Sequence, residues 1–443
     1  MGSENDSQRL AIAALLLLAP AALAQELPPA DGGTASQVSS PGAPAANPSG
    51  VTELPREDMV ETALSPQRPV SKSTFGGYGE LTFNKLNGTS QSNLQDRGNG
   101  NTSSILPNSV IDLRRFVLFF GHDFTDDLRF YSEVEFEHAV ASAADMGEAE
   151  IEQAFLDWLP SHAVNFRVGL ILMPMGIINV YHEPTTFNAV DRPDVDTVII
   201  PTTWREAGLG LFGEIAEGLR YQVYAGTSFN ANGFNAQYNL FDGHQEADLA
   251  FGGDLSIIGR LDWEPILGTV IGAAAYGGTS GNSLTSTVGA VPLGMYDVDA
   301  RTRLGGFSGR IELAVLTIGD AAALDRSLQA SWNAANGTLV PWDGPVSSLS
   351  YGGYVEAAYD LLHLLAPGAT QGLTLFDRID AVDTQAGVPV GFSAVLTDER
   401  WSDIVGIVYR PIPEIAFKAD YRRQYLGDGE AYNEIDSGIA WLF

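Results

Sequence analysis

Apolar and polar positions alternate along most of this chain, from about residue 74 to the end. In residues 128–137, Phe130, Val134 and Phe136 fall on one face of an extended strand, while charged side chains fall on the other. An alternation of period two predicts β-strands whose two faces meet different environments. The same pattern recurs in residues 219–224, 255–263, 311–313 and 415–422. A β-sandwich and a β-barrel would both produce it.

The connections between the predicted strands favour the barrel. Short turns are predicted at residues 160–162, 216–218, 265–267 and 411–413. Long connections are predicted at residues 84–109, 173–203, 230–250, 280–302 and 385–399. Alternating short turns and long loops are typical of transmembrane barrels in the bacterial outer membrane.

The tryptophans and the last residue indicate the same class of protein. Trp158, Trp263 and Trp441 are predicted near the short-turn ends of strands, and Trp204 and Trp401 near the long-connection ends. Such rings form the girdles of membrane barrels at the two interfaces. The chain ends on Phe443 in an alternating strand. This ending resembles the signal that barrel-assembly machinery recognises, so that machinery is an expected partner.

The strand count fixes the place of the longest ordered-looking connection. About 15 segments are clear, and single-chain outer-membrane barrels have an even number. We place the missing strand in residues 320–348, where residues 320–333 could form a short strand or a small helix. With about 16 strands in an antiparallel transmembrane β-barrel, residues 173–203 connect strands five and six. We call this stretch loop 3, the third extracellular loop, and expect it to fold inward.

The N-terminal part predicts export. Residues 10–24 (LAIAALLLLAPAALA) form a short apolar run that ends in a small-residue cleavage pattern. We therefore expect a cleaved signal peptide over residues 1–24, although an N-terminal anchor helix would have a similar sequence. Residues 25–73 are rich in Pro, Ala and Ser and predict a disordered periplasmic leader. Residues 74–443 would form the barrel, in the outer membrane of a Gram-negative cell and in contact with its lipid.

Composition excludes several function classes. The formal net charge of −31 argues against a nucleic-acid partner, which would require a basic surface. The chain has no cysteine, so disulfides, thiol catalysis and cysteine-based metal sites are excluded. After the N-terminal region there is no apolar run of 18 residues that could form a spanning helix.

Strand parity directs a set of arginines away from the lipid and towards the lumen, as candidates for an ion path. They are Arg114, Arg129, Arg167, Arg220, Arg260, Arg310, Arg378 and Arg422. The same parity directs many carboxylates inward, so these arginines either brace the wall through ion pairs or form a path for anions. Lysines are almost absent from the barrel, with only Lys85 and Lys418. We therefore expect weak selectivity, with cations favoured where the carboxylates dominate.

Loop 3 carries its own candidate groups for a pore constriction. They are His182, Glu183, Asp191, Arg192, Asp194 and Asp196. The three aspartates could offer oxygen ligands to Ca²⁺, but they lack the spacing of a known calcium loop. We predict no metal site and no cofactor.

The sequence favours a channel over an enzyme. It contains neither a nucleophile elbow nor an H-E-x-x-H motif, and its six histidines are scattered singly. A serine within hydrogen-bond reach of a histidine, in the lumen or at the rim, would favour a barrel enzyme instead. A further alternative is a non-conducting structural or adhesive barrel whose acidic loops bind ions or partners.

Three stretches resemble the phosphate-selective porin O and P family. They are Arg114-Arg115-Phe116, the run RVGLILMPMGIINVYHEPTTFNAVDRPDVDTVIIPTTWREAGLGLFGE, and YVEAAYDLLHLLAPG. The resemblance implies a 16-stranded porin that forms a homotrimer and carries small hydrophilic ions and solutes passively through an eyelet made by loop 3. It also implies that arginines and lysines lining the lumen select phosphate.

Overall fold

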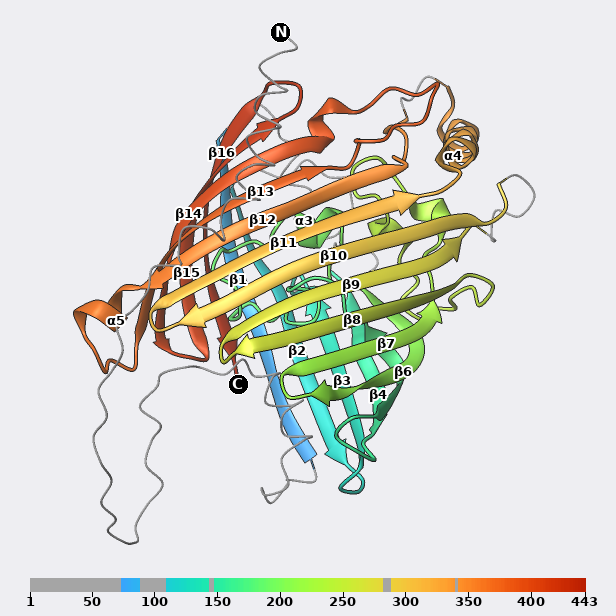
Figure 1. Ribbon diagram of the computed structural model, residues 1–443. Helices are drawn as coiled ribbons and strands as arrows, with labels where there is room; N and C mark the ends of the chain where they lie inside the picture. Colours follow the sequence, from blue (N-terminus) through green and yellow to red (C-terminus); the bar gives the residue numbers. More distant parts are fainter. Residues whose placement is uncertain (1–72, 88–108, 143–146, 282–287, 339–341) are drawn as a thin grey trace, which may run out of the picture. The chain divides into compact units, whose positions relative to one another are not determined.

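The computed structural model describes residues 73–87, 109–142, 147–281, 288–338 and 342–443, and these form sixteen strands (Figure 1). The strands are β1 (Ser73–Asn87), β2 (Ser109–Asp123), β3 (Leu128–Glu137), β4 (Ala149–Trp158), β5 (Asn165–Leu172), β6 (Arg205–Ala216), β7 (Leu219–Thr227), β8 (Leu255–Ile266), β9 (Thr269–Ser280), β10 (Val291–Leu304), β11 (Phe307–Ile318), β12 (Leu349–Asp360), β13 (Gly372–Asp383), β14 (Glu399–Ile412), β15 (Ile415–Leu426) and β16 (Ala431–Leu442). The predicted signal peptide and leader lie outside the described residues.

Each strand pairs antiparallel with its sequence neighbour, and β1 pairs with β16 to close the ring. At the seam, the Gly77 amide donates to the Phe443 carbonyl at 2.9 Å, and the Phe443 amide donates to the Gly77 carbonyl at 2.8 Å. Closure satisfies the backbone groups that an open edge would expose to lipid. The predicted antiparallel barrel of about 16 strands is therefore confirmed.

One strand lies where the sequence pattern predicts a long connection. Residues 280–302 were predicted to be a loop, but β10 begins at Val291 and runs to Leu304. Its first half has apolar side chains on both faces: Leu293 and Met295 are buried, while Tyr296 and Val298 are exposed. The apolar–polar alternation is lost there because loops fill the barrel interior beside this strand. Residues 320–333 contain no strand and instead fall in the helix α4 (Ala321–Asn336).

Three helices occur among the described residues, and all lie in connections. The helix α3 (Val195–Val198) belongs to loop 3, α4 to the connection between β11 and β12, and α5 (Leu361–Leu365) to the turn after β12. In the part of the chain that the structure describes, none is long and apolar enough to cross a membrane.

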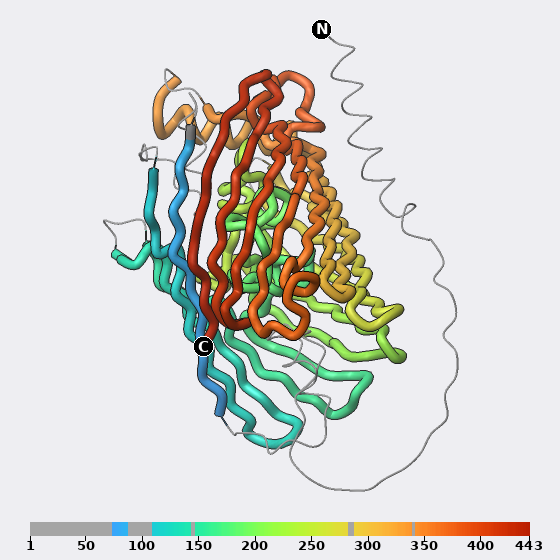
Figure 2. The backbone as a smooth tube through the Cα atoms, turned by 90° about the vertical axis from the view of Figure 1, so that its left-hand side faces the viewer, coloured from blue at the N-terminus to red at the C-terminus, as the bar shows by residue number. Residues whose placement is uncertain are grey.

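Burial alternates along the strands as the sequence pattern requires. In β15, Lys418, Asp420 and Arg422 are buried, whereas Phe417 and Tyr421 are exposed. The exposed members are apolar, so they face outward to the lipid, and the buried members face the lumen. Figure 2 shows connections of the middle part of the chain inside the ring of strands.

The tryptophans follow the predicted girdles with one exception. Trp158 and Trp263 are about half exposed on the outer face, and Trp401 stacks on Tyr425 at 4.2 Å between ring centroids. Trp204 was predicted for the girdle, and that prediction is wrong, because its side chain is fully buried. It lies just before β6, and its ring is 5.0 Å from that of Phe229 in the barrel interior.

Candidate functional site: the lumen around loop 3

Loop 3 (residues 173–203) leaves β5 and reaches strands that are not its neighbours in the sheet. The Val190 amide donates to Asp420 of β15 at 2.7 Å, and Lys418 of the same strand donates to the Ala189 carbonyl at 2.9 Å. The Arg378 guanidinium of β13 donates to the Asp191 carbonyl at 3.1 Å. Loop 3 therefore crosses the interior of the ring to the wall opposite its attachment.

An apolar cluster fills the lumen on one side of loop 3. Val195 and Val198 of α3, and Ile199 just after it, pack with residues 228–254. These residues connect β7 and β8, and we call them loop 4. Loop 4 contributes Phe229, Phe234, Tyr238 and Leu240 to this cluster, and the wall adds side chains from β7 to β12. The Asn239 side chain ties the two loops by donating to the Val198 carbonyl at 3.0 Å. This side of the lumen is therefore packed with apolar side chains.

The other side of loop 3 faces a cavity that is partly open to solvent. Its walls come from β1, β2, β3, β14, β15, β16 and the two loops. Its charged lining comprises five arginines and five carboxylates: Arg114, Arg115, Arg192, Arg400 and Arg422 with Glu80, Glu135, Glu137, Asp191 and Asp194. The lining is thus formally neutral, in contrast to the net charge of −31 for the whole chain.

A β-bulge explains why two successive arginines face this cavity. The register between β1 and β2 shifts at Glu80, so Arg115 pairs with Glu80 and Leu113 pairs with Leu81. The extra residue is Arg114, and a bulge turns consecutive side chains to one face. Arg114 forms an ion pair with Asp191 at 2.7 Å, and Arg115 forms one with Glu80 at 2.9 Å. Parity alone identified Arg114 and missed Arg115.

The carboxylates of loop 3 are held by wall arginines at separate points. Asp194 accepts from Arg400 at 3.4 Å and from Arg422 at 3.2 Å, whereas Asp191 accepts from Arg114. Asp196 is buried on the other side of the loop, beside Glu312 of β11. The three aspartates therefore do not converge on a single calcium site.

Arg192 is the basic residue of loop 3, and its contacts differ from the ion pairs of Asp191 and Asp194. Its guanidinium donates to the Thr203 hydroxyl at 2.9 Å, and no carboxylate lies within 4.0 Å among the described residues. Its side chain is half-buried and lines the cavity. Burial, together with the nearby Arg115, lowers the pKa of Arg192 to about 10, so the side chain stays charged at neutral pH.

Three more cations contact loop 3 through its backbone carbonyls. Arg310 donates to Thr186, Arg410 donates to Thr185 at 3.3 Å, and Lys418 donates to Ala189. None of the three has a carboxylate within 4.0 Å in the described part of the chain. They hold the loop through these backbone carbonyl groups rather than through ion pairs.

The remaining predicted arginines brace the wall or lie apart from the loop. Arg167 makes a two-pronged pair with Asp157, with both bonds at 2.8 Å, and Arg129 pairs with Asp123 at 3.1 Å. Both pairs lie near the short-turn side of the barrel. Arg220 lies in register with Glu214 and Asp262 on the neighbouring strands.

Arg260 and Arg378 combine a bracing ion pair with a loop contact. Arg260 pairs with Asp262 and Asp299 and donates to the Gly176 carbonyl at 3.2 Å. Arg378 pairs with Asp380 at 3.0 Å and donates to the carbonyls of Asp191 and Arg192. Bracing and loop attachment therefore use the same guanidinium groups.

Asp196 forms a carboxyl pair with Glu312 under the start of loop 3. Glu312 accepts from the Ile177 amide at 2.9 Å, and Gly176 leaves no room for a side chain, since a Cβ would come within 2.9 Å of carboxylate oxygens of both acids. Burial raises the pKa of Asp196 to about 7, opposed by a hydrogen bond with Glu312. Asp297 and Asp299 of β10 and Arg260 of β8 are the other charged groups nearby.

The raised pKa of Asp196 predicts a pH-dependent stability. A carboxyl whose pKa is higher in the folded protein contributes stability below its unfolded pKa and loses it as the pH rises through the folded pKa. We expect the free energy of unfolding in detergent or lipid to fall between about pH 4 and about pH 7. Asp196→Asn, which mimics the protonated acid, should flatten this slope. An unchanged slope in the variant would exclude Asp196 as its source.

The first part of loop 3 is attached to β1, β2 and β4. His182 is fully buried, and its Nε2 lies 2.8 Å from the Tyr78 hydroxyl and 2.5 Å from Glu152. Arg115 donates to the His182 carbonyl at 2.9 Å. Glu183 is buried next to it, and its carbonyl accepts from the Thr186 amide at 2.9 Å. These two predicted constriction residues lie away from the cavity lining.

Among the described residues, a serine and a histidine lie within hydrogen-bond distance, which is the contact that would favour a barrel enzyme. The Ser73 hydroxyl lies 2.8 Å from His122 Nδ1 at the short-turn rim. The neighbouring pair on the same face is Phe75 with Phe120, both exposed on the outer surface. The contact therefore sits in an outward aromatic girdle. The adjacent Asp123 pairs with Arg129 rather than orienting the imidazole, so a triad arrangement is not formed among these residues.

Comparison with known proteins agrees with this geometry. The sequence model of the family described as phosphate-selective porin O and P matches residues 81–241. An uncharacterized protein of Aquifex aeolicus (strain VF5) is 31% identical over 374 residues, covering 84% of this chain and 80% of the relative.

Solved structures share the fold at low sequence identity. The outer membrane channel DcaP of Acinetobacter baumannii matches with a TM-score of 0.51 at 12% identity, covering 84% of this chain and 97% of that one. OmpF of Salmonella typhi, in complex with daunomycin, matches with a TM-score of 0.53 at 11% identity over the same shares of the two chains. Together with the closed sixteen-stranded barrel, these findings show that the chain belongs to the phosphate-selective porin O and P family and is an outer-membrane porin.

Proposed function

We propose that this porin passes small hydrophilic ions passively and favours anions, phosphate among them, where loop 3 narrows the lumen. The observation that carries the proposal is Arg192: a charged guanidinium in the cavity lining without a carboxylate in contact among the described residues. Rings or rows of Arg and Lys offer anions charge in place of their hydration shell.

The acidic total charge does not oppose this proposal as strongly as the sequence suggested. Many lumen carboxylates are already paired with arginine, as Glu80, Asp157, Asp191 and Asp194 show. A paired carboxylate offers little net field to a passing ion, because its partner cancels it at short range. Arg310 and Arg410 donate to carbonyl groups of the loop instead, so their charge is not cancelled by a carboxylate within 4.0 Å in the described part of the chain.

Planar-bilayer recordings of the purified wild-type porin test the proposal. We expect discrete conductance steps, a reversal potential on the anion side in a KCl gradient, and a reduced chloride current when phosphate is added. A reversal potential on the cation side would contradict the anion preference. Absence of any conductance would favour the non-conducting structural or adhesive barrel.

The proposal also covers the export and assembly of the porin. We propose a homotrimer assembled in the outer membrane after removal of a signal peptide over residues 1–24, with Phe443 read by barrel-assembly machinery. The Phe443 ring remains exposed in the closed barrel and stacks on Phe116 at 6.3 Å, although its backbone already completes the seam. A Phe443→Ala variant that assembles in cells as efficiently as the wild type would contradict the role of this ring.

A further inference from the structure

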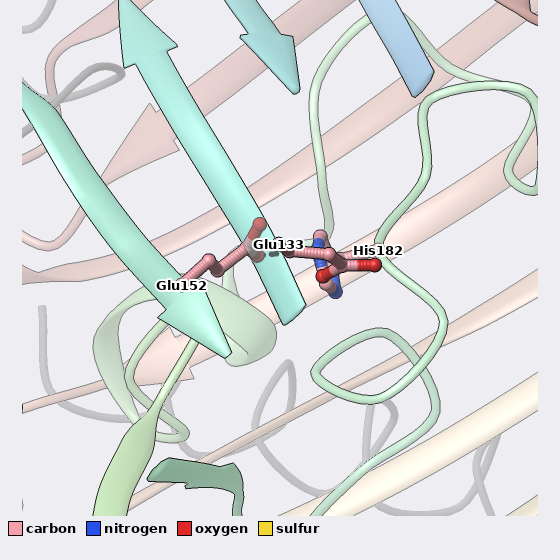
Figure 3. A group of neighbouring side chains, drawn as sticks. All are labelled: Glu133, Glu152 and His182. Carbon is pink, nitrogen blue, oxygen red and sulfur yellow. Dashed lines mark ion pairs between the residues drawn. The ribbon is translucent and has the colours of Figure 1, made fainter. Parts of the chain in front are cut away.

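A histidine and two glutamates meet where loop 3 touches the barrel wall (Figure 3). Glu133 comes from β3, Glu152 from β4 and His182 from loop 3, and each is at most 1% exposed. In the described part of the chain, they are the set of His, Asp or Glu residues whose ligand atoms all lie within 4.8 Å of one another. Figure 3 shows the three side chains pointing toward a common point.

A β-bulge brings the second glutamate into this group. The register between β3 and β4 shifts after Glu133, which pairs with Gln153, while Val134 pairs with Ile151. Glu152 is the extra residue, and both it and Gln153 are buried on the lumen side. Bulges re-aim side chains and are frequent next to functional sites. Without this bulge, strand parity would direct either Glu152 or Gln153 to the lipid.

The hydrogen bonds of His182 indicate which of its two ring nitrogens carries a hydrogen and which can act as a ligand atom. Nδ1 lies 3.2 Å from the Asn179 carbonyl, and a carbonyl can only accept, so Nδ1 carries a hydrogen. Nε2 then faces Glu152 at 2.5 Å and the Tyr78 hydroxyl at 2.8 Å. A neutral imidazole would direct its Nε2 lone pair at a carboxylate, and a shared proton would relieve that repulsion. A metal ion bound to both groups, with their atoms moved apart, would take the place of this proton.

The surroundings of Glu133 and Glu152 resemble the outer shell of a metal site. Tyr131 donates a short hydrogen bond to Glu133, and the Gln153 amide donates to its other oxygen at 2.5 Å. The Tyr78 hydroxyl donates to Glu152 at 3.3 Å. Ligating histidines usually donate their second nitrogen to a carbonyl, and ligating carboxylates are themselves hydrogen-bonded. Both conditions are met here.

We propose that Glu133, Glu152 and His182 bind one divalent first-row transition-metal ion, such as Zn²⁺. One imidazole with two carboxylates is a donor set suited to such ions, and two carboxylates neutralise the charge of the ion in a buried position. Binding replaces the proton on His182 Nε2, so one proton is released as the nitrogen–metal bond forms. The ion would fasten the start of loop 3 to β3 and β4, which is a role beyond the proposed ion conduction.

Zinc titration of the refolded porin tests this proposal. The protein is refolded with a chelator, transferred to chelator-free detergent solution and titrated with ZnCl₂ by calorimetry in two buffers of different ionisation enthalpy. We expect one equivalent to bind, with about one proton released. Substitution with Co²⁺ should give the visible absorption of a nitrogen- and oxygen-ligated ion.

Matched variants separate the site from nonspecific binding to an acidic protein. Glu152→Gln and His182→Gln should each weaken zinc binding by at least about tenfold. His244→Gln should not, since His244 is another loop histidine beside a carboxylate, Glu246, with its side chain only 9% exposed, but lies outside the group. Heat-dependent gel mobility and circular dichroism establish that each variant is folded. Should Glu152→Gln be unable to fold, Glu133→Gln takes its place.

Two results would overturn the proposal. One is the absence of stoichiometric zinc binding to the folded wild-type porin. The other is binding that Glu152→Gln and His182→Gln leave unchanged. In either case the contact between His182 and Glu152 is a shared proton only. Neither result bears on conductance, so the proposed channel function is tested separately.

Discussion

Arg192→Glu is expected to move the reversal potential of the porin from the anion side toward the cation side. Arg192 lines the cavity beside loop 3, and its guanidinium contacts the Thr203 hydroxyl rather than a carboxylate among the described residues. Glutamate at this position would replace an attraction for passing anions with a repulsion. It would also join Asp191 and Asp194, which would turn a neutral lining acidic.

The expected size follows from Coulomb's law. Two unit charges about 4 Å apart interact by about 1 kcal/mol in bulk water and by about 4 kcal/mol at the effective dielectric constant of a protein surface. Reversing the charge therefore changes the energy of an anion at the constriction by at least about 2 kcal/mol. The other cations of the lumen dilute this effect, so we expect a several-fold fall in the anion-to-cation permeability ratio.

Two controls accompany the measurement. Arg192→Gln removes the charge without reversing it and should give an intermediate reversal potential. Arg423→Glu makes the same charge change on the exposed outer face of β15, next to Tyr425, and should leave the reversal potential unchanged. If Arg192→Glu and Arg423→Glu give the same permeability ratio, Arg192 is not the group that the ions meet.

The barrel was predictable because lipid imposes a simple rule on the outer face. Apolar side chains must occur at every second position, as Phe417, Ala419 and Tyr421 illustrate, and the rule holds whatever lies inside. The rule holds for the outer face of β10 as well, but Leu293 and Met295 are buried against loops, so the inner face is not polar and the alternation disappears. A strand with apolar side chains on both faces resembles an irregular connection when only alternation is counted.

The details of the lumen were predictable only where strand parity is unbroken. Strand parity predicts that Arg378 and Arg422 face inward, and both side chains are buried in strands that run without a bulge at those positions. Arg115 and Glu152 were missed because each lies at a bulge that turns two successive residues inward. A bulge depends on the register of the neighbouring strand, which a single sequence does not display.

Ion pairing determines whether an inward-facing charge can act on a passing solute. The contacts in the lumen join residues that are far apart in the sequence. Asp194 and Arg422 are 228 positions apart in the chain, and Lys418 and Ala189 are 229 apart. Counting charges treats every inward carboxylate as part of the lumen field. The structure shows that several of them are partners of arginine, so the field beside loop 3 does not follow from the charge count alone.

Trp204→Ala is expected to cause the largest loss of stability of any single substitution considered. The Trp204 side chain is fully buried, and its ring lies 5.0 Å from Phe229 and 4.9 Å from Tyr276. It therefore joins loop 3, loop 4 and β9 in one apolar cluster. Removing a buried aromatic side chain of this size leaves a cavity and costs about 3–5 kcal/mol.

Trp263→Ala is the matched control for Trp204→Ala, because Trp263 is 52% exposed on the outer face of β8. The free energy of unfolding is measured for both variants by urea titration of the porin refolded in lipid bilayers. The loss should be clearly larger for Trp204→Ala, since its ring packs against protein on all sides and Trp263 packs partly against lipid. An equal loss in the two variants would mean that loops 3 and 4 do not stabilise the barrel from within. The loops would then be held mainly by the polar contacts of Arg378, Lys418 and Arg422 with loop 3.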